Sequence, residues 1–515
     1  MRSVLILILF LFLTSDYISQ DSKKITKSFF PDFDIEIPSP AFKKNKGFTN
    51  YKEMMSFLDS LVKDYPNDIS YRYIGSSQKG KKIPMVYIGN QTNYLAKVCY
   101  MGGLHGNEPA SSEGMLFLIH NLLKEDSLRH LKENLSIAII PMANVDGYEK
   151  QDRYAANGQD LNRDQTKFSN PESIYIKRAV NKFSPDLMVD FHEYKPYRVD
   201  FVNFGEFGVT QQYDAMFLYS GNLNVSKSIR KVTEDYFITQ VKPKLDYYDL
   251  KHHNYISSKH KNNAIYFNLG SVSSRSSATS YALSNCVSIL MEIRGVGLKR
   301  TSFNRRVFTT YLLANSYLNT ALKNSNELKL AIKQANQFPE DIIIKYKKQK
   351  SGYTLNMIDV YENKLIPINV TLHNGLECSP VIKRKRPNYY IIESELSIVT
   401  DKLAILGLDI DTLNYDEILE VESYKIISSK KSPILFQGFH ENIIKSEIIL
   451  ENKLFKKGTF IVPMNQRRSN LAVETLEPEM LSGFLRFNVM KPESINKIHR
   501  YLQNKQLWKR IFLSL

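Results

Sequence analysis

The residues best suited to chemistry are two histidines and a glutamate in two short segments. His105 and Glu108 are three positions apart in "GGLHGNEPASSEG", and His192 follows much later in "DLMVDFHEY". A catalytic zinc ion prefers imidazole and carboxylate ligands, and three protein ligands leave a fourth position open for water. A helix cap would equally explain Glu108, and an ordinary hydrogen-bonded side chain would explain either histidine. The motif alone is therefore weak evidence for a metal site.

A second segment is rich in hydrogen-bond donors. Residues 144–164, "NVDGYEKQDRYAANGQDLNRD", contain Arg153, Asn162 and Arg163. An arginine can hold a carboxylate through two parallel hydrogen bonds. The segment is a candidate carboxylate-binding pocket, and its alternative interpretation is a solvated arginine loop.

A third candidate is Glu292 in the apolar run "ILMEIRG". A carboxylate is costly to bury unless it is paired or used. Next to a metal-bound water, it is a natural general base. The competing interpretation is a structural ion pair with Arg294.

These candidates fall where predicted strands end. Nearly continuous apolar runs alternate with helical patterns, which predicts a mixed, largely parallel α/β sheet with helices on both faces. In such sheets, ligands collect at the carboxyl ends of the strands. Four polar clusters are expected to converge there: residues 105–108, 144–147, 192–193 and 292–295.

The ordered set of motifs resembles the carboxypeptidase A-like zinc metallocarboxypeptidases. The resemblance covers about residues 45–325. It rests on "IGSSQKGKKI", "GGLHGNEPASSEG", "PMANVDGYEKQDR", "NGQDLNRD", "DLMVDFHE" and "ILMEIRG", in the order of the family. The set as a whole is far more specific than any one of its members.

The resemblance implies hydrolysis of the C-terminal peptide bond of peptides or proteins. A zinc-activated water would attack the bond, with a glutamate as general base. The roles implied are one Zn²⁺ ion held by His105, Glu108 and His192; Arg153 polarising the scissile carbonyl; Asn162 and Arg163 binding the terminal carboxylate; and Glu292 as the catalytic glutamate.

One loop departs from the pattern of that family. Members typically carry a substrate-covering tyrosine about two dozen residues before the catalytic glutamate. Here the loop reads "NLGSVSSRSSATSYALSN", with Ser274 and Arg275 near that place and Tyr281 closer to the glutamate. Arg275 either favours acidic substrates or forms a salt bridge within the loop.

The N-terminus predicts export. One arginine precedes an apolar run from Val4 to Leu13, which is too short to span a bilayer and fits a signal peptide over residues 1–19. Retention of this segment as an anchor is the alternative. We expect a secreted or periplasmic protein without stable membrane insertion after removal of the leader. The two cysteines in strand-like runs, Cys99 and Cys286, are expected to be buried, inert thiols.

The charge composition does not favour nucleic acid as a partner. The chain of 515 residues has a formal net charge of +16, from 69 Lys and Arg against 53 Asp and Glu. Most of the surplus is scattered lysine, and there is no arginine-rich helix or zinc-finger spacing. The expected partners are peptide or protein C-termini.

Two regions are predicted after the leader. Residues 45–338 form the catalytic domain, which ends in a helical segment interrupted near Asn324. Residues 339–515 form a β-rich accessory region of short alternating runs and turns. The last segment, residues 497–515, is predicted as a packed terminal helix.

The favoured function is therefore a secreted zinc carboxypeptidase. The sequence leaves two alternatives open. One is a related zinc amidohydrolase that cuts cell-wall peptide or another non-standard amide, which the altered loop would permit. The other is a metal-stabilised binding module without turnover, although the joint presence of ligands, arginines and general base argues against it.

Overall fold

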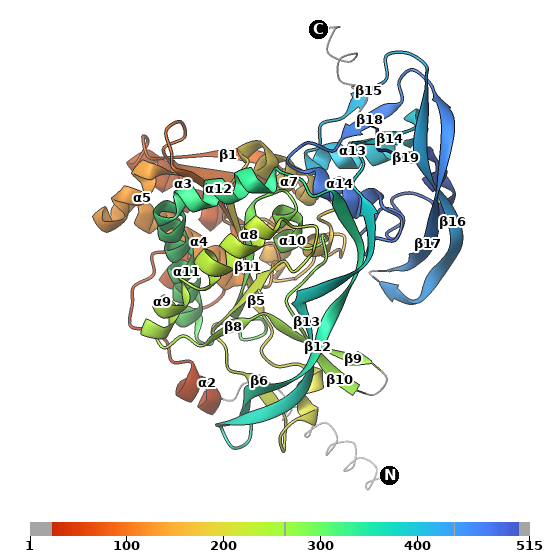
Figure 1. The fold of residues 1–515 in the computed structure, drawn as a ribbon. Coiled ribbons are helices and arrows are strands. Elements are labelled where there is room, and N and C mark those ends of the chain that lie inside the picture. The colour runs from red at the N-terminus through yellow and green to blue at the C-terminus, as the bar shows by residue number, and fades with distance from the viewer. Residues whose placement is uncertain (1–22, 262–263, 437, 504–515) are drawn as a thin grey trace, which may run out of the picture.

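The computed structural model describes residues 23–261, 264–436 and 438–503, and three sheets organise them (Figure 1). The predicted signal peptide lies outside these residues. The central sheet has eight strands in the order β1-β2-β4-β3-β5-β11-β7-β8. Its members are β1 (Ile69–Ser76), β2 (Lys82–Gly89), β3 (Ala96–Gly102), β4 (Leu135–Ile140), β5 (Leu187–Tyr194), β7 (Ala215–Tyr219), β8 (His252–Asn254) and β11 (Val287–Arg294).

The centre of this sheet is parallel. Strands β4, β3, β5 and β11 pair in parallel, whereas β1, β2 and β7 join antiparallel neighbours. The predicted mixed, largely parallel α/β fold is confirmed. Strands buried on both faces explain the nearly continuous apolar runs of the sequence.

Helices cover both faces of the sheet. Alternate residues of β3 point to opposite sides, so that Val98 and Tyr100 join one core cluster and Cys99 and Met101 join another. The first cluster includes α4 (Pro109–Lys124) and α11 (Phe303–Lys323), and the second includes α7 (Pro171–Phe183). Cys99 and Cys286 are free and buried, as expected.

Two helix starts differ from those that helical spacing in the sequence predicts, which are a possible cap at Thr49 and a helix from about Ser112. Helix α3 (Tyr51–Asp64) is capped by Asn50, which forms a reciprocal capping box with Glu53. Thr49, the expected cap, instead binds the buried carboxylate of Glu113 through its backbone N–H and its hydroxyl. Helix α4 begins at Pro109 rather than at Ser112, because Pro109 suits the first turn of a helix.

A second sheet extends from the central domain into the C-terminal region. Its order is β6-β12-β13-β10-β9, and β13 pairs in parallel with β10. The bounds are β6 (Val209–Gln211), β9 (Ile256–Lys261), β10 (Ala264–Leu269), β12 (Asp341–Asp359) and β13 (Lys364–Lys385). The predicted boundary at residue 338 follows helix α12 (Ser325–Ala335), yet the next two strands share a sheet with the first region.

A third sheet, in the order β15-β18-β14-β19-β16-β17, forms the upper right part of Figure 1. It contains β14 (Tyr389–Ile392), β15 (Asp411–Thr412), β16 (Glu417–Phe436), β17 (Phe439–Phe455), β18 (Phe460–Pro463) and β19 (Ile498–Tyr501), with helices α13 (Ser397–Leu406) and α14 (Ser469–Leu476). The prediction of a terminal helix is wrong for residues 498–501, which form β19 and pair with β14 and β16. The remainder from residue 504 lies outside the described residues.

Arginine side chains attach this third unit to the central domain. Arg467 donates hydrogen bonds to the carbonyls of Ser284, Pro185 and Asn285, and to the hydroxyl of Ser184. Because these acceptors lie next to the starts of β5 and β11, the contact fixes the C-terminal unit against the strands that carry the candidate site.

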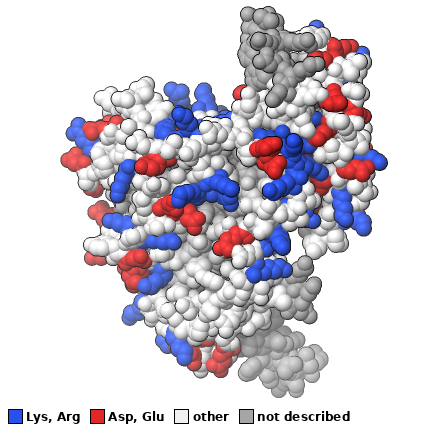
Figure 2. Space-filling view, in the orientation of Figure 1, with Lys and Arg blue, Asp and Glu red and all other residues white. Residues whose placement is uncertain are grey.

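The surface agrees with the interpretation of the charge surplus. On the face shown in Figure 2, basic and acidic side chains are interspersed. Within the described residues, no helix combines the length and apolar character that a bilayer crossing requires.

Glu474 of helix α14 is a buried carboxylate at the junction with the central domain. Its Oε1 accepts hydrogen bonds from the side-chain amides of Asn222 (2.8 Å) and Asn224 (3.1 Å). Burial raises the pKa of Glu474 to about 7, and the two amides offset only part of this effect. Ionisation of Glu474 therefore costs stability as the pH rises from the unfolded-state pKa toward 7.

We predict that Glu474→Gln raises the melting temperature relative to the wild type above pH 7, and that the difference disappears below about pH 5. The upper bound on the gain is about 3 kcal/mol, because one pKa unit corresponds to about 1.4 kcal/mol. Thermal unfolding across pH measures it, with the exposed Glu327→Gln as control. A variant that is destabilised equally at every pH would contradict the prediction.

Candidate metal centre and active site

Sheet register places two of the predicted residues side by side. Glu292 of β11 pairs directly with His192 of β5 in the parallel ladder. Alternate residues of each strand, among them Phe191 and Met291, point to the opposite face and join the core beneath α4 and α11. Asp190, two positions before His192, therefore shares the face of His192 and Glu292.

His105 and Glu108 lie in the turn between β3 and α4. The turn requires close backbone approach, since a Cβ atom on Gly106 would lie 2.1 Å from the carbonyl carbon of Gly147. His105 Nδ1 is 2.8 Å from Glu108 Oε1, and His192 Nδ1 is 2.8 Å from Glu108 Oε2 and 3.0 Å from His105 Nδ1. The structure thus brings the three predicted ligands together, all of them buried.

Two aspartates fix the histidine rings. His105 Nε2 is 3.0 Å from Asp160 Oδ1, and His192 Nε2 is 2.9 Å from Asp190 Oδ2. A neutral imidazole donates from one ring nitrogen and accepts at the other. With Nε2 donating to the aspartate, each Nδ1 keeps a lone pair for a metal ion that it would share with Glu108. This arrangement is typical of histidine ligands in metal sites.

The donor set fits zinc. Two imidazole nitrogens and one carboxylate converge within 4.8 Å of one another, a separation that one ion with bonds of about 2 Å can bridge. His105 also lines a cavity of about 560 Å³, which leaves a side of the site open to substrate and water.

The predicted donors lie at the edge of this cavity. Arg153 pairs with Asp160 (3.0 Å) and its Nη1 is 3.4 Å from Glu108 Oε1. Asn162 Oδ1 accepts the backbone N–H of Ser277 at 2.9 Å, which leaves its NH₂ group for a ligand. Arg163 donates to the carbonyl of Asn162 at 2.8 Å. The short turn formed by residues 160–164 thus holds Asn162 and Arg163, and its Asp160 anchors Arg153 beside the metal ligands.

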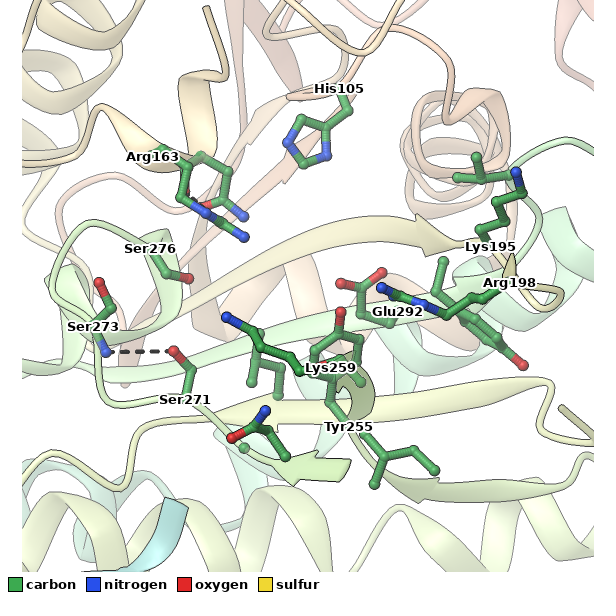
Figure 3. Close-up of a pocket in the computed structure, with 18 of the residues that line it drawn as sticks. His105, Arg163, Lys195, Arg198, Tyr255, Lys259, Ser271, Ser273, Ser276 and Glu292 are labelled. Carbon is green, nitrogen blue, oxygen red and sulfur yellow. Dashed lines mark hydrogen bonds between the residues drawn. The ribbon is translucent and has the colours of Figure 1, made fainter. Parts of the chain in front are cut away.

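Glu292 lies across the cavity from His105 and Arg163 (Figure 3). Burial raises its pKa to about 7, while the nearby histidines and Arg153 oppose the rise. It forms no ion pair with another described residue, so the alternative pairing with Arg294 is absent; Arg294 instead stacks 3.9 Å from the ring centroid of Phe30. A partly exposed carboxylate without a structural partner is suited to proton transfer.

The loop that contains Arg275, which differs from the family pattern, contacts the C-terminal region. Arg275 donates to the carbonyl of Arg163 (2.9 Å), and its guanidinium lies 4.6 Å and 3.8 Å from the ring centroids of Phe436 and Phe487. Phe436 itself lines the cavity. Tyr281 is buried beneath Lys177 and does not line the cavity, whereas Tyr255 lies beside Glu292.

Of the four polar clusters expected at the strand ends, residues 144–147 contribute least to the site. Asn144 caps helix α6 (Val145–Lys150), and Asp146 accepts the backbone N–H of Lys79. Asp160, Asp190 and Tyr255 were not predicted from the sequence as residues of the site. The two-residue spacing of Asp190 and His192 on one strand could have indicated that these two side chains pair. Nothing in the sequence connects Tyr255 with Glu292.

The α/β fold and this site define a metal-dependent hydrolase. Comparison with known proteins identifies it further: the model of the zinc carboxypeptidase family, peptidase family M14, matches residues 54–325. The chain belongs to this family and is a metallocarboxypeptidase with a single zinc ion. The suspected resemblance is confirmed.

Relatives extend the similarity beyond the catalytic region. Carboxypeptidase 2 of Trichophyton rubrum is 26% identical over 462 residues, which cover 86% of this chain and 84% of that protein. Carboxypeptidase D of Homo sapiens is 30% identical over 164 residues, 28% of this chain and 12% of that protein. Carboxypeptidase A from Helicoverpa armigera matches in structure with a TM-score of 0.43 and 19% identity, over 56% of this chain and 79% of that chain.

We predict that Asp190→Ala weakens zinc binding by about 10–100-fold, because His192 loses the partner that orients its ring. Competition with a chelator measures the affinity. Asp186→Ala is the matched control, since this buried carboxylate binds Lys329 and the Lys97 backbone at the start of the same strand. Equal zinc affinity in the wild type and Asp190→Ala would contradict the prediction.

Proposed function

We propose that this metallocarboxypeptidase is exported and removes the C-terminal residue of peptides or proteins. The observation that carries the proposal is that Arg163 and Asn162 line the same cavity as His105. Glu292 lies across this cavity from His105 and Arg163. A peptide bond can reach the metal site while the free carboxylate that follows it reaches the donors. Recognition of that carboxylate makes the enzyme an exopeptidase.

Each of these side chains has a separate role in the proposed reaction. Asn162 and Arg163 bind the terminal carboxylate and so set the position of the last peptide bond. Arg153 directs its guanidinium at the carbonyl oxygen and stabilises the charge that develops there. Glu292 accepts a proton from the attacking water and returns it to the leaving amine. When bound, zinc acts as a Lewis acid and lowers the pKa of water.

Export rests on the N-terminal segment. Its single arginine, short apolar run and following polar residues are typical of a secretory leader over residues 1–19. The mature enzyme would then act outside the cell or in the periplasm. Detection of a processed N-terminus in the exported protein supports this location, and an unprocessed protein retained in the cell contradicts it.

A related amidohydrolase remains the second candidate, because the loop containing Arg275 departs from the usual pattern. Matched peptides with free and amidated C-termini separate the two functions. A carboxypeptidase releases single amino acids only from the free termini, since an amide cannot form the same charged pair with Arg163. Equal cleavage of both sets, or cleavage of acylated amino acids alone, would favour the amidohydrolase.

We predict that Glu292→Gln lowers kcat by about 10²–10⁴-fold, since glutamine cannot accept the proton. Zinc content should remain at one ion per chain, because Glu292 is not among the three clustered ligands. Turnover and metal analysis on the same sample measure both quantities. The exposed Glu327→Gln serves as control, and full activity of Glu292→Gln would contradict the assigned base.

A further inference from the structure

The cavity carries more positive charge than the proposed reaction requires. Seven basic side chains line it: Arg153, Arg163, Lys195, Arg198, Lys259, Arg275 and Lys348. Among the described residues that line the cavity, the only carboxylates are Glu193 and Glu292. Glu193 is already paired with the buried Arg306 at 2.6 Å. One terminal carboxylate would leave most of this charge without an opposite charge.

Four of the cations have structural or assigned partners. Arg153 pairs with Asp160, and Arg163 is proposed for the terminal carboxylate. Arg275 binds the carbonyl of Arg163 between two aromatic rings. Lys348 donates to the side chain of Asn268 at 3.0 Å. These groups shape the cavity, but their hydrogen-bonding capacity is at least partly used.

The other three cations have no ion-pair partner among the described residues. They are Lys195 and Arg198, which follow β5, and Lys259 on β9. Figure 3 shows the amino group of Lys259 on the side of Glu292 where Arg163 lies, and Lys195 and Arg198 on the opposite side. The free cations therefore flank the position where the peptide bond would be cut.

Like charges are close together on these walls. Burial lowers the pKa of Lys348, and the charge of Lys259 adds to the lowering. The positive charges of Arg198, Arg163 and Arg153 all act on the Tyr255 hydroxyl, which lies beside Glu292. A ligand with additional negative charge relieves this repulsion, whereas a basic ligand increases it.

We propose that the preferred substrates are acidic C-terminal tails, with aspartate or glutamate on both sides of the cleaved bond. Lys259 binds the side-chain carboxylate of the terminal residue, on the side of Arg163. Arg198, with Lys195, binds the carboxylate of the residue before it. This proposal rests on the proposed carboxypeptidase function, and it assigns substrate selection to cations that the reaction itself does not use.

Matched blocked peptides test the proposal on the full-length zinc enzyme. The series ends in Ala-Leu, Ala-Glu, Glu-Leu, Glu-Glu and Ala-Lys. We expect kcat/KM to rise by about tenfold for each added glutamate and to be lowest for the terminal lysine, as expected for a charge pair in a partly solvated cavity. The advantage of the acidic peptides should shrink as ionic strength rises.

Two variants separate the two sides of the cavity. Lys259→Gln should reduce the Ala-Glu over Ala-Leu ratio of kcat/KM about tenfold, whereas Arg198→Gln should reduce the Glu-Leu over Ala-Leu ratio. Lys63→Gln, on the exposed face of α3, is the matched control and should change neither ratio. Zinc content and thermal unfolding confirm that each variant is folded.

The outcomes distinguish this inference from the function on which it rests. Two results would overturn the acidic preference and leave the carboxypeptidase function intact. In one, the wild type cleaves the Ala-Leu peptide as fast as the Glu-Glu peptide. In the other, neither Lys259→Gln nor Arg198→Gln changes its kcat/KM ratio. Failure to cleave every peptide in the series overturns the proposed function and the preference with it.

Discussion

The site depends on two buried hydrogen bonds between aspartate and histidine. Asp160 and Asp190 hold the Nε2 atoms of His105 and His192, so both Nδ1 atoms face Glu108. Without these carboxylates, each ring could rotate and present the wrong nitrogen. Asp160 also pairs with Arg153 and accepts the backbone N–H of Asn162. One carboxylate thereby connects the metal centre with the predicted substrate donors.

Residues from all three sheets line the cavity. The central sheet supplies His192 and Glu292, and the second sheet supplies Lys259 and Lys348 as one wall. The long hairpin of the third sheet brings Phe436 to the cavity and against Arg275. The C-terminal region is therefore part of the site.

The sequence predicted the fold and the cluster of His105, Glu108 and His192, for identifiable reasons. Continuous apolar strands and helical spacing are local signals, and the paired residues Glu292 and His192 follow once β5 and β11 are neighbours. The residues it missed depend on tertiary contacts. Tyr255 and Lys259 enter the cavity from β8, β9 and their connection, which lie over the site only after folding. The capping position moved from Thr49 to Asn50 because a buried Glu113 engages Thr49.

Anomalous X-ray scattering at the zinc edge, from crystals of the metal-loaded enzyme, tests the central claim most directly. The account predicts one strong peak per chain, bonded at about 2.0–2.2 Å to Nδ1 of His105, Nδ1 of His192 and the carboxylate of Glu108. A peak elsewhere in the chain, or coordination through Nε2 with the rings turned away from Asp160 and Asp190, would contradict it.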